Sequence, residues 1–136
     1  MAAGYSGTAL VRKLGIRAGS RVCVLDAPDS YGRIVPDLPP DLRFVAIGDA
    51  PVDLVHVFAT RRRPLAAHLA RARRTLAQAG AVWVSWPKKA SGAASEIDEN
   101  AVRALALDAG FVDVKVCAID GVWSGLKLVI RVADRR

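Results

Sequence analysis

Two adjacent lysines follow a short apolar run, and their types and spacing suit the binding of an anion. The stretch Ala81–Gly92 reads AVWVSWPKKASG, and Pro87 separates its apolar part from its basic part. Lysine ammonium groups beside a hydroxyl and an indole can hold a phosphate or a carboxylate. The candidate ligand-binding residues of this stretch are Trp86, Lys88, Lys89 and Ser91. The sequence equally allows a structural role, in which Trp86 covers the core and the lysines are solvated.

Further candidates lie in two loops that the sequence predicts near the same edge of a sheet. Trp123 and Ser124 fall in the connection of a predicted hairpin, where a tryptophan needs a partner surface. Asp26 follows an apolar run and could accept a ribose hydroxyl or an amine; capping the next helix, together with Asp29, is the alternative. If the closing strand lies beside Ala81–Trp86, the two tryptophans would flank one crevice.

The histidines and cysteines show no spacing that predicts a metal site or a nucleophile. Cys23 and Cys117 each lie in an apolar run and are expected to be reduced thiols in the core. His56 is expected to be buried and hydrogen-bonded, and His68 lies on the flank of a predicted helix. We therefore assign no catalytic residue and no metal ligand, and the sequence leaves open whether the protein is an enzyme.

The chain is strongly basic, with a formal net charge of +7 over 136 residues. Such a balance favours nucleic acid, anionic ligands or acidic partners. Arg71 and Arg74 fall on the side of a predicted helix opposite its leucines and are the candidate nucleic-acid contacts. An ordinary solvated face and an arginine-rich composition explain the same charge.

The elements that must position these residues alternate between strand and helix in one domain, 1–136. Predicted strands cover 21–25, 42–46, 52–58, 81–86, 111–119 and 126–132, and predicted helices cover 6–15, 60–80 and a segment after 95. A short helix is expected before Pro36, and a six-residue connection joins the last two strands. We expect a three-layer Rossmann-like α/β fold, mostly parallel with a C-terminal antiparallel hairpin.

Specific residues mark the expected ends of these helices. Ser6 or Thr8 would cap the first helix and Gly15 would end it; Ser95 and Asp98 have the spacing of a capping box. Leu65, Leu69, Ala72 and Leu76 form the apolar stripe of the longest helix, and Gly80 would terminate it. Val112, Val114, Val116 and Ala118 would share one face of the hairpin.

The order of these blocks resembles class I S-adenosylmethionine-dependent methyltransferases. KLGIRAGSRVCVLDA, VDLVHVF, QAGAVWVSW and LALDAGFVDVKV are similar to successive parts of that family. The resemblance implies that Ala81–Trp86 lies beside the final hairpin strand. The chain departs from the family where glycines should follow the first strand and where a carboxylate should end the second. One strand–helix unit is also missing.

Over nearly the full length the chain resembles a bacterial family known only as a domain of unknown function. AGYSGTALVRKLGI, VWVSWPKKASG and KVCAIDGVWSGLKLVIR carry that resemblance. It implies a small cytoplasmic protein, common in actinobacteria, with no assigned activity. No apolar run of membrane-spanning length and no leader are evident, which fits that expectation.

These observations predict a non-catalytic, methyltransferase-like domain that binds an anionic small ligand or an acidic protein partner through Trp86–Ser91. That hypothesis expects no cofactor. The first alternative is an atypical methyltransferase that binds S-adenosylmethionine. The second is a basic nucleic-acid-binding accessory protein. The sequence gives no oligomeric state, partner identity or biological process.

Overall fold

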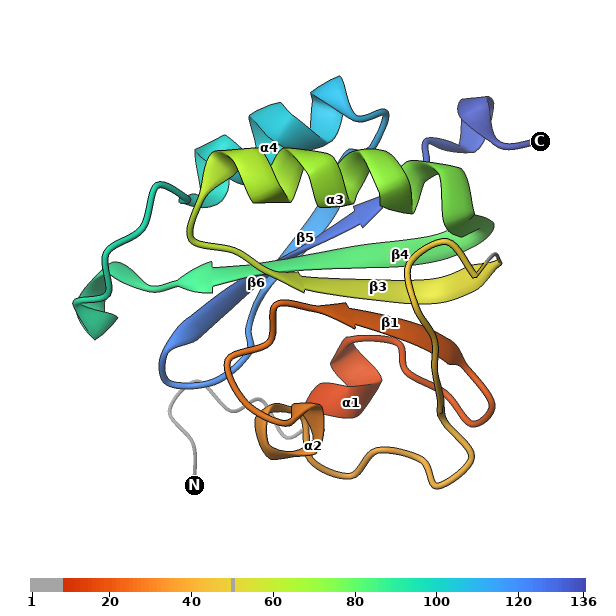
Figure 1. The fold of residues 1–136 in the computed structure, drawn as a ribbon, viewed down its shortest axis with the longest axis horizontal. Coiled ribbons are helices and arrows are strands. Elements are labelled where there is room, and N and C mark those ends of the chain that lie inside the picture. Colours follow the sequence, from red (N-terminus) through yellow and green to blue (C-terminus); the bar gives the residue numbers. More distant parts are fainter. Residues whose placement is uncertain (1–8, 50) are drawn as a thin grey trace.

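The computed structural model describes residues 9–49 and 51–136, which form a six-stranded sheet in the order β2-β1-β3-β4-β6-β5 (Figure 1). Strands β1 to β4 run parallel, and β6 runs antiparallel to both β4 and β5. The strands are β1 (Arg21–Leu25), β2 (Arg43–Phe44), β3 (Val52–Phe58), β4 (Leu76–Pro87), β5 (Val112–Ala118) and β6 (Trp123–Val129).

Helices cover both faces of this sheet, which confirms the predicted three-layer α/β fold (Figure 1). One face packs against α3 (Arg62–Thr75) and α4 (Glu99–Asp108). The other packs against two helices of a single turn, α1 (Leu10–Lys13) and α2 (Tyr31–Ile34). Two short 3₁₀ turns, η1 (Lys89–Ser91) and η2 (Val132–Asp134), complete the chain. Within the described residues, no helix is long and apolar enough to cross a bilayer.

The central strands are buried on both faces, as their nearly continuous apolar sequences predict. In β3, every residue but Asp53 is buried, and β4 is buried from Val82 to Trp86. β-Branched side chains suit such positions because helices pack against both sides of the sheet. The predicted adjacency of Ala81–Trp86 and the closing hairpin is also confirmed, because β4 pairs with β6.

The predicted helix over 60–80 is too long at its C-terminal end. The helix ends at Thr75, and Leu76 begins β4 by pairing with Val52. Gly80 therefore lies in a strand and does not terminate the helix. A Cβ atom there would approach the carbonyl oxygen of Asp53 to 2.7 Å, so the close approach of β3 and β4 requires glycine.

Several other boundaries differ from the prediction. The second strand covers only Arg43–Phe44, at the edge of the sheet, where it pairs with β1 alone. The first helix begins at Leu10, and the proposed caps Ser6 and Thr8 lie outside the described residues. Gly15 and Gly110 adopt φ of 82° and 91°, which confirms that each ends its helix in the left-handed conformation.

The closing hairpin was predicted too far along the chain and with too long a connection. Strand β6 begins at Trp123, so residues 119–122 form the connection. Of the residues predicted to share one face of β5, Val114 is 52% exposed and Val116 49% exposed. The strand is at the edge of the sheet, and a register shift between Asp113 and Lys115 interrupts its alternation.

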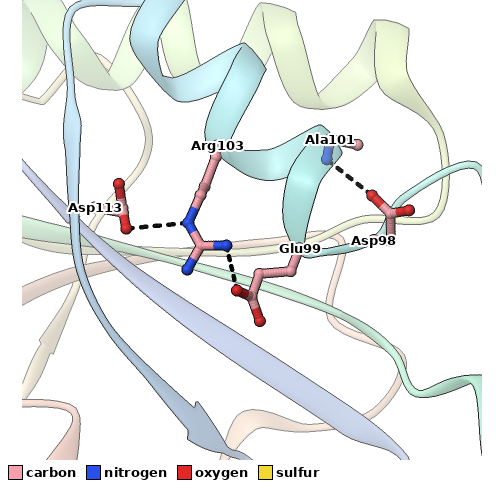
Figure 2. A network of polar contacts seen from close by, with 5 residues as sticks. All are labelled: Asp98, Glu99, Ala101, Arg103 and Asp113. Atoms are coloured by element: carbon pink, nitrogen blue, oxygen red, sulfur yellow. Dashed lines mark hydrogen bonds and ion pairs between the residues drawn. The ribbon is translucent and has the colours of Figure 1, made fainter.

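Helix α4 begins at a different cap from the one predicted. Asp98 is itself the N-cap and accepts a hydrogen bond from the amide of Ala101 at 2.8 Å (Figure 2). Ser95 instead binds the backbone of Ile97. Figure 2 also shows Arg103 bridging Glu99 on its own helix and Asp113 on β5, which raises the pKa of the guanidinium.

Candidate functional site

A pocket of about 260 Å³ opens at the carboxyl ends of β1 and β3, which is where open α/β sheets bind ligands. We call it the Asp26 pocket. Asp26 follows β1, Thr60 and Arg61 follow β3, and Trp123 begins β6. The rest of its wall comes from the end of β3 and the first turns of α3: Val57, Phe58, Ala59, Pro64, Leu65 and His68.

Asp26 and His68 form a polar pair on the wall of this pocket. His68 Nε2 donates to Asp26 Oδ2 at 2.9 Å, because the carboxylate can only accept. Asp26 has φ of 60°, a left-handed conformation that aspartate tolerates better than most residues. His68 Nδ1 is buried and has no hydrogen-bond partner among the described residues. The predicted capping role of Asp26 is wrong, since its carboxylate bonds to α3 and not to α2.

Aromatic rings form the floor of the pocket and continue into the core. Trp123 meets Phe58 edge to face at a centroid distance of 5.3 Å, and Phe58 stacks on His56 at 4.4 Å. Tyr31 of α2 contacts both Phe58 and His56 edge to face. The ring at the pocket is therefore held in place by a row of buried rings.

Hydrogen bonds join two of these rings, those of Tyr31 and His56, to Ser85 in a buried network. Tyr31 Oη lies 2.6 Å from His56 Nδ1, and His56 Nε2 lies 2.7 Å from Ser85 Oγ. His56 and Ser85 are fully buried, which confirms the expectation for His56. Burial lowers the pKa of His56 to about 3 and raises the pKa of Tyr31. This network of Tyr31, His56 and Ser85 is uncharged near pH 7, and it fixes α2 to the sheet.

The basic loop after β4 is held mainly by its own hydrogen bonds. Lys88 donates its side-chain Nζ to the carbonyl of Asp120 at 2.8 Å and its amide to the carbonyl of Val122 at 2.7 Å. Ser91 Oγ donates to the carbonyl of Lys88. The side chain of Lys89 is exposed and has no hydrogen-bond or ion-pair partner within the described residues. Of the four residues predicted to bind here, only Lys89 presents an uncommitted charge.

The two tryptophans lie on opposite faces of the sheet and do not flank one crevice. Trp86 is 6% exposed and packs in the core beneath α3 and α4. Ser124 is its partner on β6, so the two share that face. Trp123 is the residue before Ser124 in β6, and it packs with the core on the α1 and α2 side. Because strand side chains alternate, adjacent pairing positions point to opposite faces.

The remaining candidates are placed as follows. Arg71 and Arg74 are exposed on α3. Cys23 is buried and Cys117 half-buried, and neither forms a disulfide. Among residues 9–49 and 51–136, no group of three His, Cys, Asp or Glu side chains is arranged to hold a metal.

The carboxyl edge of the sheet suits the amino-acid end of an adenosyl ligand such as S-adenosylmethionine better than its ribose end. The Asp26 carboxylate lies at the end of β1, in the acidic position of the resemblance described above. The following loop, Ala27–Ser30, contains no glycine, and β2 ends in Phe44 without a carboxylate for ribose hydroxyls. Asp49 lies at the amino ends of the parallel strands, because its backbone carbonyl accepts a hydrogen bond from Arg21 at the start of β1.

Sequence reasoning missed two groups of this region. His68 was placed only on a helix flank, and Tyr31 and Ser85 were not singled out. The signal was weak: a histidine in an apolar strand needs two buried partners, but nothing in the sequence says which residues supply them. The pairing of Asp26 with His68 spans 42 residues and depends on how α3 crosses the sheet.

No protein-family model matches the chain, and no curated protein does. Solved structures do match. A SAM-dependent methyltransferase from Aquifex aeolicus has a TM-score of 0.65 and 13% identity over 89% of this chain and 88% of its own. A putative type 11 methyltransferase from Sulfolobus solfataricus gives 0.65 and 14% over 93% and 92%. Magnesium protoporphyrin IX methyltransferase from Synechocystis PCC 6803, with bound SAM, gives 0.57 and 11% over 89% and 74%.

At these identities the likeness establishes the fold alone. The chain has the Rossmann-like fold of the S-adenosylmethionine-dependent methyltransferases, in a form that spans nearly the whole length of the first two structures.

Proposed function

We propose that this domain is a methyltransferase-type protein that binds S-adenosylmethionine or its demethylated product in the Asp26 pocket. The observation that carries the proposal is the position of that pocket: it opens at the carboxyl ends of β1 and β3, with an accessible carboxylate on its wall. The methyltransferase fold of the chain supports the methyltransferase alternative over a purely non-catalytic role. When bound, S-adenosylmethionine would supply an electrophilic methyl group.

The residues of the pocket suit the amino-acid end of such a ligand. The Asp26 carboxylate is 58% exposed and can accept from an ammonium group. Arg61 is exposed, and no carboxylate within the described residues pairs with it, so its guanidinium can bind a carboxylate. The indole of Trp123 favours a neighbouring cation such as a sulfonium. The volume of about 260 Å³ suits part of the ligand, since whole drug-sized ligands occupy roughly 300–1,000 Å³.

The proposal is tested by calorimetric titration with S-adenosylmethionine and S-adenosylhomocysteine. Asp26→Asn is the informative variant, because asparagine tolerates the left-handed backbone and can still accept from His68. We expect it to bind at least about tenfold more weakly, as expected for the loss of one charge-assisted contact. Asp29→Asn, in the same loop but outside the pocket, should bind like the unaltered protein. Absence of binding at millimolar ligand would refute the proposal.

Catalysis needs a separate measurement. Transfer of a labelled methyl group from S-adenosylmethionine to a component of a cell extract, lost in Asp26→Asn, would assign methyltransferase activity. Binding of both ligands without any transfer would instead fit the non-catalytic reading of the fold.

The basic loop after β4 is a second candidate, for an anionic ligand or an acidic partner. The observation that favours it is rigidity: three hydrogen bonds fix Lys88 and Ser91 and leave the amino group of Lys89 exposed. Lys89→Ala should abolish such binding without lowering the thermal midpoint. Lys88→Ala is the poorer test, because it also removes the bond to Asp120. Unchanged affinity of Lys89→Ala would exclude this loop.

Nucleic-acid binding through Arg71 and Arg74 stays a prediction. Both side chains are exposed on one helix, which is the arrangement that such binding needs. Affinity for a DNA duplex should then fall steeply with salt and fall further in the double alanine variant. A flat salt dependence would exclude it.

A further inference from the structure

The amino edge of the sheet carries a second hollow, remote from the Asp26 pocket. It has a volume of about 450 Å³ and lies between the loop after α1 and the first half of β4. We call it the amino-edge groove. Arg17, Gly19 and Ser20 line it from the loop, Asp53 from β3, and Lys127 from β6.

Positive charge exceeds negative charge along this groove, where Arg17 and Lys127 lie beside one carboxylate, that of Asp53. Lys127 lies directly opposite Lys115 in the β5–β6 pair, an arrangement of like charges that destabilises a sheet. Burial lowers the pKa of Lys127, and the charge of Lys115 lowers it further. Among the described residues, neither lysine has a carboxylate within ion-pair distance.

Two further cations extend this group. Arg17 lines the groove, and Lys13 lies in the last turn of α1. Burial raises the pKa of the Cys117 thiol, and the charges of Lys13 and Lys115 partly offset that rise, so both lysines lie near this thiol. Cys117 and Lys115 share the face of β5 that looks toward α1, because their partners are Gly125 and Lys127. Lys115 therefore lies on the same sheet face as Lys127, and Lys13 acts on that face through its charge.

Among the described residues, Asp53 supplies the one carboxylate that lines the groove, and this carboxylate is already hydrogen-bonded. Asp53 Oδ2 accepts a hydrogen bond from the amide of Arg21 at 2.8 Å. A partly buried lysine beside a second lysine, with no acidic partner, is unfavourable unless an anion compensates it.

We propose that the amino-edge groove binds a small phosphate-bearing anion through Lys127 and Arg17, with Lys115 and Lys13 adding long-range attraction. The site is distinct from the Asp26 pocket, and its existence does not depend on the function proposed there. Lysine and arginine side chains around a polar hollow suit a phosphate or pyrophosphate group, whose charge would relieve the repulsion between Lys115 and Lys127.

The test is a titration with inorganic pyrophosphate at constant ionic strength, with chloride as the compensating salt. We expect the thermal midpoint to rise by several degrees at saturating pyrophosphate. Lys127→Gln should weaken binding by about tenfold or more. Its midpoint without ligand should not fall, because the substitution removes a repulsive charge. Arg63→Gln, in the first turn of α3 at the opposite edge of the sheet, is the matched control and should bind normally, because Arg63 is exposed and lines neither hollow.

A second variant reverses the sign of the effect. Asp53→Asn removes the negative charge from the groove while leaving an oxygen to accept from Arg21, so it should bind pyrophosphate more tightly. ADP that binds as tightly as pyrophosphate would show that the groove recognises phosphates whatever carries them. No midpoint shift beyond that of chloride, or equal binding by Lys127→Gln and Arg63→Gln, would overturn the proposal. Binding of a DNA duplex through Lys127 without binding of pyrophosphate would also overturn it.

Discussion

The two faces of the sheet are covered in different ways. On one face, α3 and α4 bury a large core that is mainly aliphatic and includes the rings of Trp86 and Phe111. On the other, α1 and α2 have four residues each, and the rings of Tyr31, Phe58 and Trp83 lie among the aliphatic side chains of a smaller core. Trp83 donates to the carbonyl of Leu14 there, and Tyr31, His56 and Ser85 form their buried chain.

This difference shows how a face with short helices keeps its core closed. The two helices on that side have four residues each, so few helical residues cover that face. Large rings compensate, because each buries more area than an aliphatic side chain. Their polar atoms then need buried partners, which fixes the positions of α1 and α2 by hydrogen bonds. Stability on this face should therefore depend on few residues.

The largest expected effect comes from Trp83→Ala. Trp83 is fully buried, and its removal leaves a cavity and an unpaired carbonyl at Leu14, so unfolding should become easier by about 4 kcal/mol or more. Leu69→Ala on the other face should cost about 3 kcal/mol. Urea denaturation of both variants measures the difference. If Leu69→Ala is the more damaging, stability is not concentrated on the short-helix face.

Acid should destabilise the folded protein chiefly through the protonation of His56. Its pKa is about 3 in the folded protein, against roughly 6.5 when unfolded, so the unfolded state binds the extra proton first. The stability that neutral His56 provides is complete above pH 6.5. It should fall by about 1.4 kcal/mol for each pH unit between pH 6 and pH 4.

Denaturation of His56→Gln over the same pH range isolates this contribution from that of the carboxylates. The variant should be less stable at pH 7, yet lose less stability on acidification. Parallel curves for the two proteins would show that His56 is not the acid-sensitive group.

Tyr31→Phe should have an intermediate effect. It keeps the ring contacts with Phe58 but leaves His56 Nδ1 without a partner, at a cost of about 1–3 kcal/mol. The loss should be non-additive with His56→Gln, because both substitutions break one chain. Strict additivity in a double-mutant cycle would show that the two residues contribute to stability independently.

The smallest effect belongs to the aliphatic face. Asp98→Ala removes the N-cap of α4 and should cost about 1 kcal/mol. Asp98→Ser should restore most of it, since serine also accepts at this position. A loss as large as that of Trp83→Ala would mean that α4 is the weaker point of the fold.

Much of the fold could be predicted because its signals are local. Strand β3 reads as a buried strand from its apolar sequence, and Gly110 marks the end of α4 from its residue type alone. The end of α3 could not be predicted, since LAQAG is acceptable in a helix and becomes strand only by pairing Leu76 with Val52. The exposure of Val114 and Val116 could not be predicted either, because it depends on the place of β5 at the edge of the sheet.

The same division holds for the candidate site. The sequence by itself determined the class of fold, and it predicted a ligand site at the carboxyl edge of the sheet with Asp26 as a candidate acceptor. Only the tertiary structure decided that Trp86 and Trp123 lie on opposite faces, that Lys88 is committed to Asp120, and that His68 reaches Asp26. The reason is physical: a strand's alternation is fixed locally, but the phase of two strands and the crossing of a helix depend on packing between distant segments.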